Sequence, residues 1–317
     1  MNTNRPKLIV ILGPTASGKS TLAIQLAKKF NGYILSADSR QVYRGMDIGT
    51  AKVTGRKTRV AGFPAIVSQG VHHFLIDIKN PDQTWTLADF QKAVKRITTR
   101  LRKHPSFSKK IPFLVGGTGL YISSIVENWD LPKGAPDLAR RKRLEKRTLD
   151  SLVKELKRKD PASAALLDLQ NKRRVVRALE YVLSTGHSFL KNQQKRRPEF
   201  DILQLGLAVP DAELTRAMTR RVRSMIRLGL VREAKRLPKK YGWDSPAMSG
   251  IGYTEIRSYL KGTLSLDDAA QQIVTHTRQY AKRQMTWFKR DTSIQWFQRT
   301  GEAKTIVQKF FSTQKTQ

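Results

Sequence analysis

Apolar runs of strand length alternate with amphipathic stretches over the first 120 residues. The runs lie at 8–12, 32–35, 73–78 and 111–115. Between the last two runs, apolar residues recur every three or four positions, which predicts a helix over about 87–101 with Thr86 as its N-cap. Strands that alternate with helices predict a parallel α/β sheet with its functional groups at the carboxyl ends of the strands. Residues 53–70 show neither period and are expected to be irregular.

The pattern changes near Pro132 and becomes almost wholly helical up to Phe200. Helices are expected at about 137–158, 161–169 and 171–184. An apolar run at 201–209 then predicts a return to strand. It is followed by predicted helices at about 211–228, 231–241, 252–260 and 266–289 and by a short strand at 294–297. The segment 121–200 is therefore predicted to be an all-helical insertion, and the two parts of one α/β core are expected at 1–120 and 201–317.

Directly after the first apolar run, residues 13–20 read G-P-T-A-S-G-K-S, the spacing of a phosphate-binding P-loop. A strand before the loop and a helix after it are the context that such a loop requires. Backbone N–H groups and the helix N-terminus would attract a phosphate, Lys19 would add a point charge, and Ser20 would offer a hydroxyl to Mg²⁺. The expected diphosphate-binding residues are Gly13, Thr15, Ala16, Ser17, Gly18, Lys19 and Ser20. The predicted fold class is thus α/β, a P-loop kinase-like parallel sheet flanked by helices.

The charge of the chain points to a polyanionic partner. The 317 residues include 60 Lys and Arg against 25 Asp and Glu, a formal net charge of +35. The segment 133–200 alone holds 19 basic and 8 acidic residues, a net charge of +11. The absence of cysteine excludes disulfides, thiolate zinc sites and a cysteine nucleophile. Without a signal peptide or a long apolar stretch, a cytoplasmic protein with no membrane contact is expected.

Polar side chains stand at the ends of two other predicted strands, on the edge of the sheet where the P-loop lies. Asp38 follows the second strand, and Thr118 lies in the Gly-Gly-Thr-Gly turn after the strand at 111–115. A carboxylate beside a P-loop either positions Mg²⁺ or accepts a proton from a nucleophile, and the structural alternative is a helix cap. The Thr118 hydroxyl would orient a reacting group, unless the turn serves only to reverse the chain.

Basic residues form further candidate sites on predicted helices. Arg221 and the pair Lys282-Arg283 would bind the far phosphate oxygens, or they form ordinary solvated helix surface. A third group shares one face of a predicted helix, opposite an apolar face. Its members are Lys172, Arg173, Arg174 and Arg177. This arrangement suits contact with a nucleic-acid backbone.

Several longer strings, together with the P-loop, resemble the tRNA dimethylallyltransferase family. They are S-A-D-S-R-Q-V-Y-R-G-M-D-I-G-T-A-K at 36–52, H-H-F-L-I-D-I at 72–78, L-V-G-G-T-G-L-Y at 114–121, R-R-V-V-R-A-L-E at 173–180, I-G-Y-T-E at 251–255 and T-R-Q-Y-A-K-R-Q-M-T-W-F at 277–288. They follow one another in the family's order over most of the chain. The resemblance implies that dimethylallyl diphosphate is the polyphosphate, that Mg²⁺ is the cofactor, and that the acceptor is the exocyclic amine of the adenosine 3′ of the anticodon in tRNAs reading codons that start with U. Pyrophosphate would leave.

The resemblance also implies roles for individual residues. Asp38 would hydrogen-bond the adenine amine and accept its proton, Thr118 would orient the amine and the diphosphate, and Arg221 would neutralise charge on the diphosphate together with Lys19. The residues implied to contact tRNA are Asp38, Ser39, Arg40, Gln41, Thr118, Arg140 or Arg141, Arg173, Arg174, Val175, Val176 and Arg177. The helical insertion would hold the anticodon stem-loop, the target base would flip out of its stack, and the protein is expected to act as a monomer. The chain departs from the family at 168–171, Ala217 and Arg223.

Three alternative functions share some of these features. An isopentenyltransferase acting on free adenine nucleotides would have the P-loop and the aspartate but would not need the basic insertion. A P-loop small-molecule kinase would transfer or hydrolyse the γ-phosphate of ATP. A non-catalytic RNA-binding protein with a relic P-loop would have no need of Lys19, Asp38 and Thr118 together.

Overall fold

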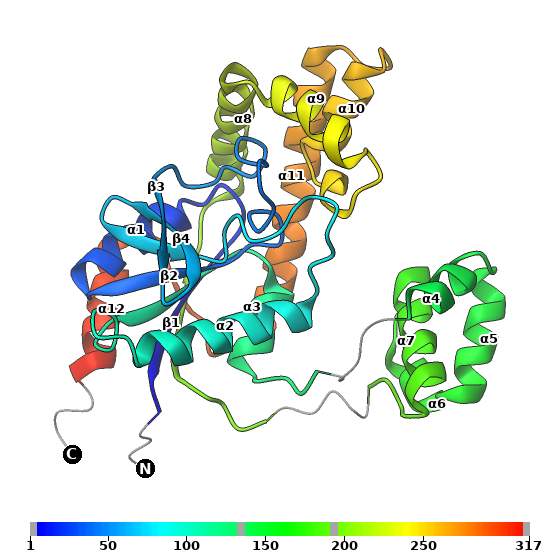
Figure 1. Cartoon of the computed structure of the whole chain (residues 1–317), viewed down its shortest axis with the longest axis horizontal. Coiled ribbons are helices and arrows are strands. Elements are labelled where there is room, and N and C mark those ends of the chain that lie inside the picture. Colours follow the sequence, from blue (N-terminus) through cyan, green and yellow to red (C-terminus); the bar gives the residue numbers. More distant parts are fainter. Residues whose placement is uncertain (1–4, 132–136, 191–195, 313–317) are drawn as a thin grey trace. The chain divides into compact units, whose positions relative to one another are not determined.

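The computed structural model describes residues 5–131, 137–190 and 196–312, and the chain forms two compact units (Figure 1). The core unit comprises the chain up to Val126 and from Glu199 onward, and the helical unit is Glu127–Pro198. The first boundary lies later than the expected position 121. The reason is a helix that the sequence did not predict, α3 (Gly119–Val126), which packs on α2 (Leu87–Arg102) in the core.

The core unit is built on one sheet with the order β3-β4-β5-β2-β6-β1-β7-β8. The strands are β1 (Lys7–Leu12), β2 (Gly32–Ala37), β3 (Arg56–Val60), β4 (Phe63–Ser68), β5 (Val71–Phe74), β6 (Ile111–Gly116), β7 (Asp201–Leu207) and β8 (Gln295–Phe297). From β5 to β8 all neighbours are parallel. Every residue of β2 is buried, as expected of a strand covered on both faces. The mixed α/β sheet flanked by helices confirms the predicted fold class.

Helices on the sheet leave its carboxyl edge free for loops. α1 (Lys19–Lys29) and α12 (Thr300–Ser312) pack on one face through a shared apolar cluster. Four more helices form a group beside the carboxyl edge (Figure 1). They are α8 (Asp211–Leu228), α9 (Leu230–Tyr241), α10 (Tyr253–Leu260) and α11 (Leu266–Phe288). No helix in the described part of the chain is long and apolar enough to cross a membrane.

The helical unit has its own apolar core. Its helices are α4 (Leu138–Glu145), α5 (Leu149–Lys159), α6 (Pro161–Leu166) and α7 (Lys172–Thr185). The single helix expected at 137–158 is two helices, because the Thr148 side chain accepts a hydrogen bond from the Ser151 N–H and starts α5 anew. Gly186, in the left-handed region, ends α7.

The expectation of an irregular segment at 53–70 is wrong. β3 and β4 form an antiparallel hairpin on the edge of the sheet, joined by Ala61 and Gly62 with φ angles of 50° and 85°. β3 reads R-K-T-R-V and is mostly exposed, so it lacks the apolar alternation by which a half-buried strand is recognised.

Candidate functional site

Three loops meet at the carboxyl edge of the sheet, where β1, β6 and β2 are neighbours. The P-loop follows β1, the Asp38 turn follows β2, and the glycine-rich turn follows β6. The Thr118 N–H donates to the Ala37 carbonyl over 3.3 Å, and the Ser39 N–H donates to the Thr118 hydroxyl over 3.3 Å. The structure therefore brings the turns that carry Asp38 and Thr118 into direct contact.

One oxygen of the Asp38 carboxylate supports its own turn. Oδ1 accepts from the N–H of Arg40 at 2.8 Å and of Gln41 at 3.2 Å. The alternative that the sequence left open, a helix cap, is not what the structure shows, because residues 39–42 form a turn and no helix begins there. Oδ2 accepts no hydrogen bond from any residue that the structure describes. Because the two oxygens differ in this way, the carboxylate can hold its turn and still accept a hydrogen bond from another molecule.

Positive charge is concentrated at the P-loop, and no carboxylate in the described part of the chain forms an ion pair with Lys19 or Arg221. The Lys19 ammonium donates to the Pro14 carbonyl at 3.0 Å. Burial, together with the charge of Arg221, lowers the pKa of Lys19 to about 8, and the opposite effect of Asp38 is smaller. Burial also lowers the pKa of Arg221, whose Nη1 lies 3.4 Å from the Thr15 hydroxyl. Two desolvated cations at one loop favour a bound anion.

Other polar groups of the P-loop could also bind an anion. α1 begins after Gly18 without a side-chain cap and has no acidic residue in its first turn. The positive end of the helix dipole is thus open. The buried Ser17 hydroxyl has no hydrogen-bond partner among the described residues. These groups fit a diphosphate. Ser20, exposed at the second position of α1, could supply a hydroxyl to a metal ion that the diphosphate also binds.

Gln284 of α11 holds two of the three loops together. Its Oε1 accepts from the Thr15 N–H at 2.8 Å, and its Nε2 donates to the Gly117 carbonyl at 2.7 Å. The side chain is buried. A Cβ on Gly117 would lie 2.1 Å from Nε2, so only glycine fits there. Sequence reasoning missed Gln284, because a glutamine inside a basic helical run looks like surface.

Tyr280, one turn before Gln284, brings a hydroxyl to the same place. Burial and the negative charge of Asp38 raise the pKa of Tyr280, while hydrogen bonds with the side chains of Thr118 and Gln284 lower it in part. The expected cations of this helix do not join the site. Lys282 and Arg283 are exposed, and the guanidinium of Arg283 lies over the Tyr280 ring.

Two residues of the stretch after Asp38 make contacts within the protein. The Arg40 guanidinium donates to the Pro246 and Ala247 carbonyls at 2.9 and 3.1 Å. The Gln41 side chain accepts from Ser36 Oγ at 3.1 Å and donates to the Thr50 carbonyl at 3.3 Å. Both side chains therefore position the loops around the site.

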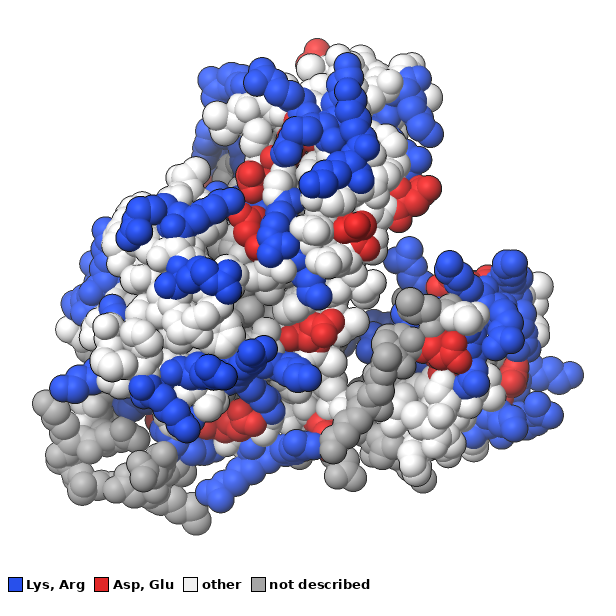
Figure 2. Space-filling view, in the orientation of Figure 1, with Lys and Arg blue, Asp and Glu red and all other residues white. Residues whose placement is uncertain are grey.

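The helical unit divides the residues implied to contact tRNA into exposed and buried ones. Arg173, Arg174 and Arg177 are exposed on α7. Val175 and Val176 are 0% and 2% exposed, so the expectation of tRNA contact through their side chains is corrected: they pack into the core of the unit. Figure 2 shows Lys and Arg spread over the visible face of this unit.

The two candidates on α4 also differ in their partners. Arg141 donates to the buried Glu180 carboxylate at 2.8 Å through Nε and at 2.5 Å through Nη2. Arg140 donates to the Ser184 hydroxyl at 2.9 Å, and its Nε lies 3.4 Å from the solvent-accessible Asp137 carboxylate. Because Arg141 forms an ion pair with a buried carboxylate, Arg140 is the better candidate for a contact outside the protein.

Replacing Gln284 by leucine should weaken the site and the fold together. Leucine leaves the partly buried Thr15 N–H and the buried Gly117 carbonyl without partners, which should lower the free energy of unfolding by about 2 kcal/mol. The loops would separate, and the affinity for pyrophosphate should fall. Urea unfolding and pyrophosphate calorimetry measure both effects. Gln272→Leu, at an exposed position of the same helix, is the matched control. Equal behaviour of the two variants would contradict the role of Gln284.

Comparisons with known proteins place the whole chain in one family. The family model for IPP transferase matches residues 41–291, and a model for isopentenyl transferase matches residues 6–63. A tRNA dimethylallyltransferase of Microcystis aeruginosa is 42% identical over 292 residues, which are 92% of this chain and 88% of that protein. One from Bacillus cytotoxicus is 39% identical over 95% of this chain and 93% of its own length.

Solved structures agree with the sequence comparisons. The tRNA isopentenylpyrophosphate transferase of Bacillus halodurans is 35% identical to this chain and gives a TM-score of 0.69. The match covers 98% of this chain and 96% of that protein. A eukaryotic dimethylallyltransferase acting on tRNA gives 0.72 at 29% identity, over 89% of this chain and 69% of its own. Because the IPP transferase model spans most of the chain and these relatives match nearly its whole length, the chain belongs to the IPP transferase family.

Proposed function

We propose that the protein transfers the dimethylallyl group of dimethylallyl diphosphate to the exocyclic amine of a tRNA adenosine, the one 3′ of the anticodon in tRNAs that read codons starting with U. The observation that carries the proposal is an anion site with two desolvated cations, Lys19 and Arg221, next to the turns of Asp38 and Thr118. Relatives at about 40% identity over nearly the whole chain carry out tRNA dimethylallyl transfer according to their names.

The reaction breaks the bond between the dimethylallyl carbon and the diphosphate oxygen and forms a carbon–nitrogen bond to the adenine. The P-loop would hold the diphosphate through the N–H groups at the start of α1, the Ser17 hydroxyl, Lys19 and Arg221, which stabilise the negative charge of the leaving pyrophosphate. Mg²⁺, bound by the diphosphate and the Ser20 hydroxyl, would add to this charge stabilisation.

On the acceptor side, Asp38 would use Oδ2 to hydrogen-bond the adenine amine and to take up its proton as the new bond forms. The Thr118 hydroxyl, at the edge of the Asp38 turn, would orient the amine toward the dimethylallyl carbon. The exposed arginines of α7 would bind the anticodon stem-loop.

The alternatives are less well supported. A transferase for free nucleotides needs no surface like that of the helical unit, and a kinase would not explain relatives named as tRNA-modifying transferases. The monomeric state and the cytoplasmic location stay predictions.

A labelling assay tests the proposed function. Incubation with Mg²⁺, labelled dimethylallyl diphosphate and unmodified tRNA should place label in tRNA, and nuclease mapping should find it at the adenosine 3′ of the anticodon. Label in free AMP but not in tRNA would support the nucleotide transferase instead. Hydrolysis of ATP without any prenyl transfer would support the kinase.

Asp38→Asn should separate the chemical role of Asp38 from its structural role. Asparagine keeps the oxygen that accepts from the Arg40 and Gln41 N–H groups, so the turn should persist. It cannot take up a proton, and kcat should fall by about 10²–10⁴ while the tRNA KM changes little. Steady-state kinetics measure both, with Asp82→Asn at an exposed position as the control. A kcat close to that of the unchanged protein would remove the proposed base.

The affinity for dimethylallyl diphosphate should fall as the pH rises through about 8. A bound diphosphate favours the protonated form of Lys19, whose pKa in the free protein is about 8. Above that pH the free protein has lost the proton, so Lys19 should contribute less to binding. Through this one group the affinity can fall by at most about tenfold for each pH unit. Calorimetry between pH 7 and 9.5 measures the effect. Lys19→Met should bind weakly with a flatter profile, whereas Lys28→Met, exposed on the same helix, should keep the full dependence. A constant affinity in the unchanged protein would contradict this role for Lys19.

A further inference from the structure

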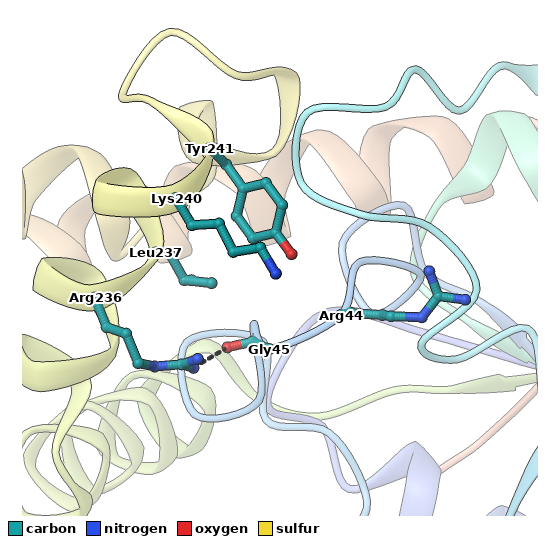
Figure 3. A pocket seen from close by; sticks show the side chains of 6 residues that line it. All are labelled: Arg44, Gly45, Arg236, Leu237, Lys240 and Tyr241. Carbon is teal, nitrogen blue, oxygen red and sulfur yellow. Dashed lines mark hydrogen bonds between the residues drawn. The ribbon is translucent and has the colours of Figure 1, made fainter.

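A hollow of about 260 Å³ lies in the core unit between α9 and the loop that follows Tyr43 (Figure 3). It is lined by Arg44, Gly45, Arg236, Leu237, Lys240 and Tyr241. The side chains of Lys240 and Tyr241 point into it from the helix, and Arg44 stands on the loop opposite (Figure 3). None of the residues assigned to the reaction lines this hollow, so the proposed chemistry does not account for it.

The hollow is basic and carries no acidic residue in its lining. Of the described groups, only neutral ones bond its arginines: Arg44 donates to the Asn80 side chain at 3.0 Å, and Arg236 donates to the Gly45 carbonyl at 3.2 Å. The Lys240 ammonium lies 5.3 Å from the centre of the Tyr241 ring. Lining cations that bond only neutral groups favour an anionic ligand.

The one acidic residue of α9, Glu233, does not line the hollow and binds groups of the protein instead. Glu233 is 5% exposed, and its carboxylate accepts from three successive backbone N–H groups, at 47, 48 and 49, each at 2.9 Å. The Tyr253 hydroxyl donates to it as well, at 2.6 Å. The three backbone bonds fix the loop against α9 and the fourth fixes α10 to α9, so the walls of the hollow are built without a ligand.

Gly45 gives the hollow its shape. Its φ of 76° lies in the left-handed region, and a Cβ there would come within 3.3 Å of Leu237 and 3.4 Å of the Arg236 guanidinium. A side chain would therefore be strained and would crowd the two residues that line the hollow.

We propose that this hollow binds a phosphodiester group of the substrate RNA, at a nucleotide other than the target adenosine. Arg236 and Lys240 would bind the phosphate oxygens, and the adjoining base or sugar would lie on Tyr241. Arg44, whose guanidinium points away from these two side chains in Figure 3, would add positive charge from the loop opposite. Arg44 follows Asp38 by six residues, so their Cα atoms lie at most about 20 Å apart. A few nucleotides would span that distance. The inference rests on the proposed function.

Figure 2 supports RNA as the source of the phosphate. Lys and Arg gather over the part of the core unit formed by α8 to α10 (Figure 2). Besides the desolvated Arg221, residues 211–241 hold nine Lys and Arg against three Asp and Glu. A single small anion would not call for so extended a basic surface, whereas a polynucleotide contacts many cations at once.

The test compares two double variants that remove the same charge. Arg44→Gln with Lys240→Gln removes two cations of the hollow, and Lys235→Gln with Lys239→Gln removes two exposed cations of α9 outside it. The first pair should raise the tRNA KM about tenfold and reduce the slope of log affinity against log salt by about 1. Its kcat and its KM for dimethylallyl diphosphate should not change. The second pair should change the tRNA KM by less than about twofold.

Equal effects of the two pairs, or an unchanged tRNA KM in the first pair, would overturn the inference. So would a first pair that loses calorimetric binding of inorganic phosphate or AMP but keeps its tRNA KM, since the hollow would then serve a free phosphate. The unchanged protein separates this inference from the proposed function. If it transfers no label to tRNA, the proposed function fails. If it does transfer label, the comparison of the two double variants alone tests whether the hollow binds the RNA.

Discussion

The arrangement of the site depends on one buried amide. Gln284 joins the P-loop to the glycine-rich turn through Thr15 and Gly117, which lie 269 and 167 residues away from it in the chain. The hydrogen bond to Gly117 is buried and the one from Thr15 is partly buried, so losing the first would leave an unsatisfied carbonyl in the interior. The sheet alone sets the strand ends next to each other. It is α11 that fixes the spacing between the two loops and brings the Tyr280 hydroxyl to them.

The fixed loops keep two like charges, Lys19 and Arg221, close together although these charges repel each other. Burial disfavours the charged forms of both Lys19 and Arg221, and the charge of Arg221 disfavours that of Lys19 further. The bond between Gln284 and the Thr15 N–H keeps the P-loop beside the Arg221 guanidinium, whose Nη1 lies 3.4 Å from the Thr15 hydroxyl. A fixed, unneutralised site loses some stability in the free protein, and it gains a stronger interaction with charge that develops on a leaving group.

Local signals made part of this structure predictable. The strand, P-loop and first helix follow from periodicity and spacing, and Asp38 and Thr118 follow from their place at strand ends. Gln284 and Tyr280 were missed, because their roles depend on where a helix near the end of the chain packs. The edge strand β3 was missed because its exposed residues show no apolar alternation. The period of the helix places Val175 and Val176 on its apolar side, where the structure has them buried, and only the resemblance grouped them with their basic neighbours.

The departures from the family at the basic helix and at α8 differ in their consequences. Asn171 caps α7 by accepting from the Arg174 N–H, so the helix that presents the arginines still begins at a defined residue. Asp168 accepts from the Gln170 N–H and supports the preceding turn. With these residues the turn before α7 and the first residue of α7 are both held by side-chain hydrogen bonds. Ala217 is different, because it brings no charge one turn before Arg221. The burial that lowers the pKa of Arg221 therefore matters more in this chain, since a desolvated guanidinium interacts more strongly with a diphosphate than an exposed one does.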